Sequence, residues 1–143
     1  MGGYNGGEIA SNLATVTARD YILANFEKVV DSEDSEQPEK QEILNKLIKK
    51  AMEEANYAIY QKAKENEQLH QMGTTLEICL IYNNRAYIGH VGDSRVYRIR
   101  NEIIRKMTAD HSYVQELVKD GTITKEEADY HPKKNMLMKA IRG

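Results

Sequence analysis

Hydrophobic residues recur at intervals of three and four in two long stretches of the first half of the chain. In residues 8–30 they fall on one stripe, which predicts a helix with one buried face. Residues 39–68 repeat this spacing, with lysine and glutamate between the apolar positions, and predict a second, longer helix. Residues 31–38 between them are acidic and end at Pro38, so we expect an exposed loop whose proline opens the second helix. The stripe of the first helix consists of Ile9, Leu13, Val16, Ile22, Leu23, Phe26, Val29 and Val30.

The spacing changes at Gly73, after which β-branched and aromatic residues become frequent. Residues 74–107 contain three short polar segments typical of tight turns, at Asn83-Asn84, at residues 92–94 and at Asn101-Glu102. These turns divide the segment into four strands, which we expect to pair as one antiparallel meander. The expected strands are residues 74–82, 85–91, 95–100 and 103–107.

Residues 108–143 return to helical spacing in short pieces. Gly121 stands where a helix C-terminal glycine belongs, Thr124 precedes acidic residues as an N-cap does, and His131-Pro132 ends the second of these short helices. The predicted fold class is therefore α+β, with two long helices packed on a meander and a small helical region after it.

Composition narrows the classes of function. Residues 1–143 suit one domain, and their net charge of −2 with 41% hydrophobic residues argues against a disordered tail or a nucleic-acid binder. No apolar run approaches the length of a membrane span, and no secretory signal is visible. The single cysteine, Cys79, lies in an apolar run without a disulfide partner, so we expect a buried thiol and a cytoplasmic location.

The opening glycines admit two interpretations. Gly2, Gly3, Gly6 and Gly7 lead directly into the first predicted helix. A glycine-rich turn before a helix can hold an anion, because its backbone N–H groups and the helix dipole both favour negative charge. An isolated stretch of this kind is more often an unstructured leader.

Four stretches follow one another in the order found in one enzyme family. They are the Met1-Gly2-Gly3 start, GTT at residues 73–75, GHVGDSR at residues 89–95 and TADHS at residues 108–112. Together they resemble the bacterial branch of the metal-dependent protein serine/threonine phosphatases, the protein phosphatase 2C (PPM) family. The tail from Ser112 onward, with Gly121, His131 and Pro132, resembles the flap beside that family's active site.

The resemblance implies a fold and a chemistry. The family fold is an αββα sandwich of two antiparallel sheets between pairs of helices, and this chain corresponds to part of it. The chemistry implied is hydrolysis of phosphoserine and phosphothreonine in proteins by water that two Mn²⁺ or Mg²⁺ ions activate. Two such ions suit this reaction because they lower the pKa of the attacking water and neutralise charge on the phosphoryl oxygens.

The resemblance carries over few of the family's metal ligands. Asp110 matches a position that helps hold a third, weaker metal near the flap, and Gly2 and Gly3 match the end of a metal-binding loop whose aspartate is absent. We therefore expect the middle part of a truncated phosphatase domain, inactive as this chain, with no tightly bound metal. The alternative is a non-catalytic module, derived from the same fold, that self-associates or binds a partner.

The remaining motif residues have structural roles in the resemblance. They are Gly73, Thr74, Gly92, Asp93, Ser94 and Arg95. We expect Asp93 to pair locally with Ser94 or Arg95, because aspartate in a tight turn commonly accepts nearby hydrogen bonds. His90 is expected to form structural hydrogen bonds, whereas His111 can also support the ligand position beside it.

A meander covered by helices on one face leaves its other face open. In the family sandwich that face packs on a second sheet. Exposed apolar side chains and strand edges favour pairing with another copy. We therefore expect a homo-oligomer, or a domain-swapped assembly, through the exposed sheet.

Overall fold

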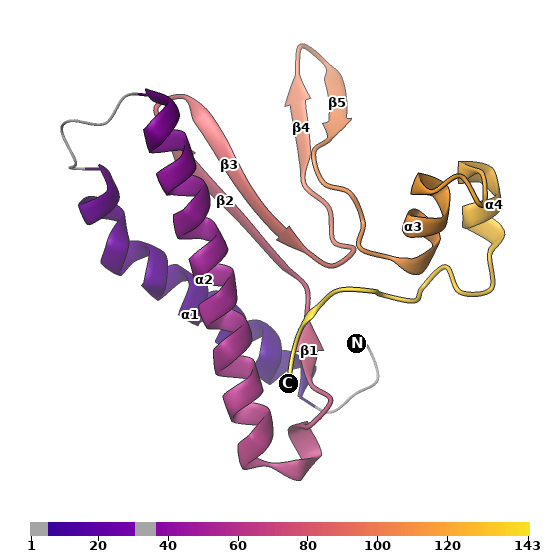
Figure 1. The fold of residues 1–143 in the computed structure, drawn as a ribbon, viewed down its shortest axis with the longest axis horizontal. Coiled ribbons are helices and arrows are strands. Elements are labelled where there is room, and N and C mark those ends of the chain that lie inside the picture. The colour runs from indigo at the N-terminus through magenta and orange to yellow at the C-terminus, as the bar shows by residue number, and fades with distance from the viewer. Residues whose placement is uncertain (1–5, 31–36) are drawn as a thin grey trace.

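The computed structural model describes residues 6–30 and 37–143, and it begins with two long helices. Helix α1 spans Gly7–Val30 and helix α2 spans Gln37–Glu65, and they pack on each other (Figure 1). Both predicted helices are thus present. The second ends earlier than expected, and a 3₁₀ turn, η1 (Glu67–Leu69), follows after Asn66. Most of the predicted acidic loop, residues 31–36, lies outside the described residues, as do Gly2 and Gly3.

The buried stripe of α1 differs from the predicted one. Ala10, Ala14 and Ala18 are the residues of this helix that are fully or almost fully buried, whereas Ile9 and Leu23 are 43% and 68% exposed. The alanines face small residues of α2, among them Ala51 and Ala55, in one cluster. Small side chains at a helix crossing let the two backbones approach closely, so the contact selects alanine over larger apolar residues.

The strands form hairpins instead of the continuous meander that the sequence predicted. Strand β2 (Leu76–Tyr82) pairs with β3 (Arg85–Val91), and β4 (Tyr97–Arg100) pairs with β5 (Ile103–Lys106), all antiparallel. Within residues 6–30 and 37–143, no ladder joins β3 to β4. The chain turns away after β3 at Gly92, whose φ of +117° suits glycine. The α+β class is confirmed, and the meander is corrected to two separate hairpins.

The turns within both hairpins are those predicted. Asn83 and Asn84 have φ angles of 49° and 58°, and Asn101 and Glu102 have 50° and 62°. Two successive positive φ angles are the mark of a type I′ turn, whose twist matches that of the flanking strands.

The β2–β3 hairpin packs one face against α2. Tyr87 is buried beside Leu44 and Ile48 of the helix, and an added Cβ at Gly89 would overlap Ile48 Cγ2. The opposite face of the hairpin is open, and Cys79 and Ile81 lie on it, both exposed. The expectation of a buried Cys79 was therefore wrong, because the alternation of side chains along β2 directs this residue away from the helices.

The C-terminal region forms two short helices beside the hairpins. Helix α3 spans Tyr113–Lys119 and helix α4 spans Lys125–Tyr130, and both lie at one side of the molecule (Figure 1). The chain then returns to pair β6 (Ile141–Arg142) with β1 (Gly73–Thr74), close to α2. The return connects the flap region to the helical layer.

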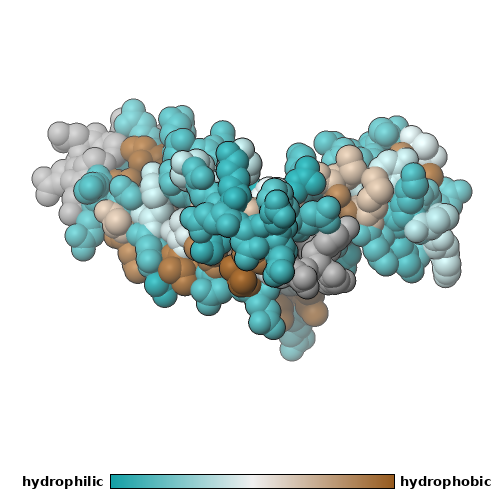
Figure 2. All heavy atoms as spheres, turned by 90° about the horizontal axis from the view of Figure 1, so that it is seen from below, coloured by the Kyte–Doolittle hydropathy of each residue, from teal (hydrophilic) through white to brown (hydrophobic). Residues whose placement is uncertain are grey.

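The surface viewed in Figure 2 is mostly hydrophilic. Figure 2 shows apolar residues, in brown, in separate groups among hydrophilic ones on the face viewed from below. In the described part of the chain, none of the helices combines the length and the apolar composition needed to cross a membrane.

Candidate functional site

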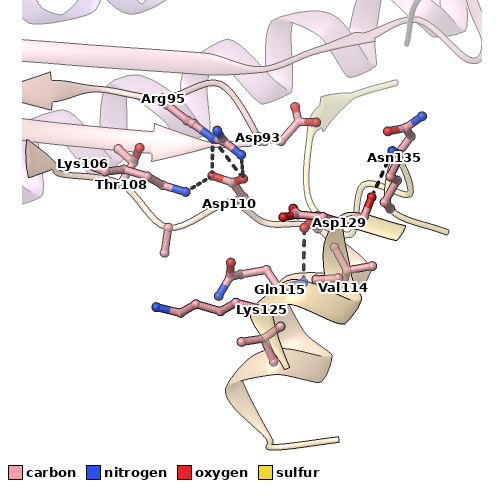
Figure 3. A pocket seen from close by; sticks show the side chains of 15 residues that line it. Asp93, Arg95, Lys106, Thr108, Asp110, Val114, Gln115, Lys125, Asp129 and Asn135 are labelled. Atoms are coloured by element: carbon pink, nitrogen blue, oxygen red, sulfur yellow. Dashed lines mark hydrogen bonds and ion pairs between the residues drawn. The ribbon is translucent and has the colours of Figure 1, made fainter. Parts of the chain in front are cut away.

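A cavity of about 750 Å³ lies between the β4–β5 hairpin and the two short helices. Four of the predicted site residues line it: Asp93, Arg95, Asp110 and Ser112. Lysines from three separate segments, Lys106, Lys125 and Lys134, also line the cavity. Figure 3 shows Lys106 and Arg95 directed toward Asp110 from the hairpin side. The cavity is therefore polar, and its lining carries three carboxylates, Asp93, Asp110 and Asp129, beside one arginine and three lysines.

Asp110 is bound by two cationic side chains at once. Arg95 Nη2 donates to Asp110 Oδ2 at 2.7 Å, and Arg95 Nε lies 3.1 and 3.2 Å from the two carboxylate oxygens. Lys106 Nζ donates to Asp110 Oδ1 at 2.7 Å. The Asp110 side chain is only 11% exposed, so both oxygens are occupied in a largely enclosed place. Charge-assisted, forked contacts of this kind are among the stronger hydrogen bonds in proteins.

These contacts shift the pKa values of the groups involved. Burial alone would raise the pKa of the Asp110 carboxyl, but hydrogen bonds from Arg95 and Lys106 outweigh it and leave that pKa below its ordinary value. The hydrogen bond to Asp110 raises the pKa of the Arg95 guanidinium further above its ordinary range. Both shifts favour the ionised forms of Asp110 and Arg95.

Two histidines, His90 and His111, join the segment around Asp110 to the β2–β3 hairpin. His90 Nδ1 lies 3.1 Å from Glu77 Oε1, and His90 Nε2 donates to the Ala109 carbonyl at 2.9 Å. The ring Nδ1 of His111 accepts from the backbone N–H of Gly92 at 3.2 Å. The backbone N–H of His111 donates to the Gly92 carbonyl at 2.8 Å. The structural hydrogen bonds predicted for His90 are thus confirmed.

The turn at residues 92–95 is held differently from the prediction. Ser94 Oγ lies 2.8 Å from Thr75 Oγ1, and Arg95 pairs with Asp110. Within the described ranges, Asp93 forms no side-chain hydrogen bond with Ser94 or Arg95. The predicted local pairing of Asp93 was therefore wrong, because both intended partners reach residues distant in sequence instead.

The other motif residues lie outside the cavity. Gly73 and Thr74 belong to the β1–β6 pair, where an added Cβ at Gly73 would come within 3.1 Å of the Ile141 carbonyl oxygen. They therefore position the returning chain, and the cavity does not include them.

The flap residues act at helix ends. Ser112 caps α3 by accepting from the Gln115 N–H, Gly121 follows that helix with a φ of +79°, and His131 is the C-cap of α4. Pro132 follows α4 and is exposed. The predicted limits of these helices are confirmed.

The described residues do not fit a bound divalent metal. In residues 6–30 and 37–143 no three histidine, cysteine, aspartate or glutamate side chains come together as a metal site. Both oxygens of Asp110 accept hydrogen bonds from cationic side chains, so the negative charge that would attract a metal is already balanced. The metal role of Asp110 and the loop role of Gly2 and Gly3 stay predictions.

Two partners in this region were missed by sequence reasoning. Lys106 is the last residue of β5, and the residue pattern of this strand gave no indication that its side chain contacts Asp110. Thr75 belongs to the GTT stretch, whose threonines could have been expected to reach a polar partner. The Thr75–Ser94 contact depends on how segments 19 residues apart meet.

Comparison with known proteins assigns the chain to a family. The family profile described as Protein phosphatase 2C matches residues 8–117. The chain belongs to the protein phosphatase 2C family. This confirms the resemblance drawn from the four motifs.

Similar proteins of this phosphatase family include bacterial enzymes. The serine/threonine phosphatase stp of Listeria monocytogenes is 34% identical over 141 residues, which cover 99% of this chain and 52% of that protein. The crystal structure of Stp1 from Staphylococcus aureus matches 98% of this chain and 51% of its own, with 37% identity and a TM-score of 0.72.

A third similar structure contains metal. The catalytic domain of the phosphatase PstP in complex with 2 manganese ions matches 99% of this chain and 53% of its own, at 31% identity and a TM-score of 0.71. The chain thus spans about half the length of the Listeria monocytogenes and Staphylococcus aureus phosphatases.

Proposed function

We propose that this chain is part of a metal-dependent protein serine/threonine phosphatase, which removes phosphate from phosphoserine and phosphothreonine in proteins. The observation that carries the proposal is the family match over residues 8–117. Similar proteins from Listeria monocytogenes and Staphylococcus aureus are serine/threonine phosphatases, which supports it. We also infer a cytoplasmic location, because Cys79 has no disulfide partner in the sequence.

We infer that the complete protein uses Mn²⁺ or Mg²⁺. The similar PstP domain in complex with two manganese ions supports this inference. When bound in such a site, these ions activate water and neutralise phosphoryl charge. Because the described residues contain no cluster of metal ligands, we propose that the chain alone holds no tightly bound metal and is inactive.

A chimaera tests whether this chain can serve as half of a phosphatase. Residues 8–143 would replace the matched segment of Staphylococcus aureus Stp1, with intact Stp1 and the isolated chain assayed beside it. We expect Mn²⁺-dependent release of phosphate from a phosphothreonine peptide by the chimaera, and none by the isolated chain. A folded but inactive chimaera would contradict the proposed function, and turnover by the isolated chain would contradict its proposed inactivity.

We further propose that the isolated chain self-associates with a second copy of itself. Apolar side chains of the two hairpins are between 45% and 74% exposed, namely Ile81, Tyr97, Ile99, Ile103, Ile104 and Met107. Burial of such side chains against a second copy would remove apolar surface from water, which lowers the free energy by about 25 cal/mol per Å² before the costs of association.

Light scattering tests this association. We expect a dimer or larger species for the parent chain, and a shift toward monomer for Ile99→Lys. Leu23→Lys on α1 is the matched control, since Leu23 is 68% and Ile99 72% exposed. A stable monomer of the parent chain at high concentration would refute the proposal.

A further inference from the structure

The β4–β5 hairpin has few attachments to the rest of the molecule. In the part of the chain that the structure describes, it shares no strand ladder with β2–β3. Arg95 lies just before β4, and Lys106 is the last residue of β5, so these two residues mark the base of the hairpin. Both bind the carboxylate of Asp110, which lies in the segment that leads into α3.

We propose that Asp110 is a positioning residue that fastens the base of the β4–β5 hairpin to the entrance of the flap, and that in this chain it is not a metal ligand. The Arg95 guanidinium holds the carboxylate through a fork, a geometry that fixes orientation as well as distance. Lys106 completes the set at 2.7 Å. The carboxylate thereby joins both ends of the hairpin to one loop.

The two bound cations disfavour a divalent metal at the same carboxylate. A metal ligated by an Asp110 oxygen at about 2.0–2.6 Å would share a carboxylate whose charge Arg95 and Lys106 already balance. A metal placed there would also face the positive charges of Arg95 and Lys106. Solvent screens this repulsion only in part, because Asp110 is 11% exposed although Arg95 and Lys106 are 49% and 34% exposed.

Three hydrogen bonds around the cluster report on its state. The Met107 N–H donates to the Val96 carbonyl at 2.8 Å, and the Val96 N–H donates to Thr108 Oγ1 at 3.1 Å. The His111 N–H donates to the Gly92 carbonyl at 2.8 Å. If Asp110 fastens the hairpin, loss of the ion pairs should let these amides open more often.

Amide hydrogen exchange of the chain tests the positioning role. In Asp110→Asn and Arg95→Gln we expect exchange at Met107 and His111 to accelerate about tenfold, because charge-assisted hydrogen bonds are lost. Lys106→Gln should give a smaller acceleration. Lys125→Gln is the control, since Lys125 lines the same cavity without binding Asp110. Unchanged exchange in Asp110→Asn and Arg95→Gln would overturn the proposal.

Calorimetric titration with Mn²⁺ alone tests the second half of the proposal. We expect Asp110→Asn to leave the Mn²⁺ titration of the parent chain unchanged, whether that titration shows binding or none. Saturable binding to the parent chain that disappears in Asp110→Asn would overturn the proposal. Neither readout depends on turnover, so failure of the proposed phosphatase function remains a separate result.

Discussion

The imidazole rings of His90 and His111 are stacked, with 4.8 Å between their centroids and 26° between their planes. His90 belongs to β3, and His111 belongs to the loop that leads into α3. The stack therefore joins the β2–β3 hairpin to the C-terminal region. The consequence for stability depends on the charge of His111. Burial, and then the nearby His90 and Lys139, lower the pKa of His111 below its ordinary value.

We predict that this histidine makes the fold less stable in mild acid. With a lowered folded pKa, the folded state binds the proton less readily than the unfolded state. The contribution of His111 to the free energy of unfolding is therefore fully present above the ordinary histidine pKa of about 6.5. It is lost as the pH falls through the lower pKa of the folded state. Urea unfolding at pH 7.5 and 5.5 should show this loss, and His111→Asn should reduce it. His70→Asn at an exposed position should leave the pH dependence as in the parent.

Gly92→Ala should destabilise the chain more than Gly121→Ala does, because overlap with Thr75 adds to a backbone strain that alone costs about 1–3 kcal/mol. Gly92 has a φ of +117°, and an added Cβ would overlap Thr75 Cγ2. Gly121→Ala is the matched control, because its φ is +79° but nothing lies within 4 Å of the added atom. Thermal unfolding of the two variants separates the clash from the backbone strain, and equal losses would show that the Thr75 contact is unimportant.

Ala14→Leu should destabilise the α1–α2 contact by about 1–3 kcal/mol, the usual cost of overpacking a filled core. Ala14 is fully buried between the two helices. Ala24→Leu places the same change at an exposed position of α1 and should be nearly neutral. Chemical unfolding monitored by circular dichroism measures both, and a neutral Ala14→Leu would contradict the close approach of the helices.

Thr124→Ala should loosen α4. Thr124 Oγ1 accepts from the Glu127 N–H at 3.1 Å, and Glu127 Oε2 accepts from the Thr124 N–H at 2.7 Å, a complete capping box. Loss of such an N-cap costs about 1 kcal/mol, which corresponds to roughly fivefold faster amide exchange at Glu127. Lys125→Ala leaves the capping box intact and should not change that rate.

Features with a local cause could be predicted from the sequence. Ser112 and Thr124 cap helices because their side chains reach backbone groups three residues away, and the Asn83-Asn84 pair adopts the φ angles that its turn requires. The order of helices and strands followed from the same kind of local pattern. The family followed from four motifs that each occupy a few consecutive residues.

Features that depend on distant segments could not be predicted. Asp110 meets Arg95, 15 residues earlier, only because the chain folds back after β5, and the spacing of charges along the sequence does not reveal this. The alanine stripe of α1 was missed because alanine adds little to a hydrophobic pattern, although it is favoured where helices approach closely. The close approach of Gly92 to Thr75, where the chain leaves the first hairpin, also joins segments that are far apart in the sequence.

The open face of the β2–β3 hairpin also makes the chain easy to observe. Cys79 is the single thiol of the sequence, it is exposed, and it lies opposite Ile88 in the strand register. A maleimide dye would therefore attach at one known position without unfolding the protein. A second copy or the remainder of a complete domain that covered this face would slow the labelling, so the rate of dye uptake gives a direct measure of whether the face is covered.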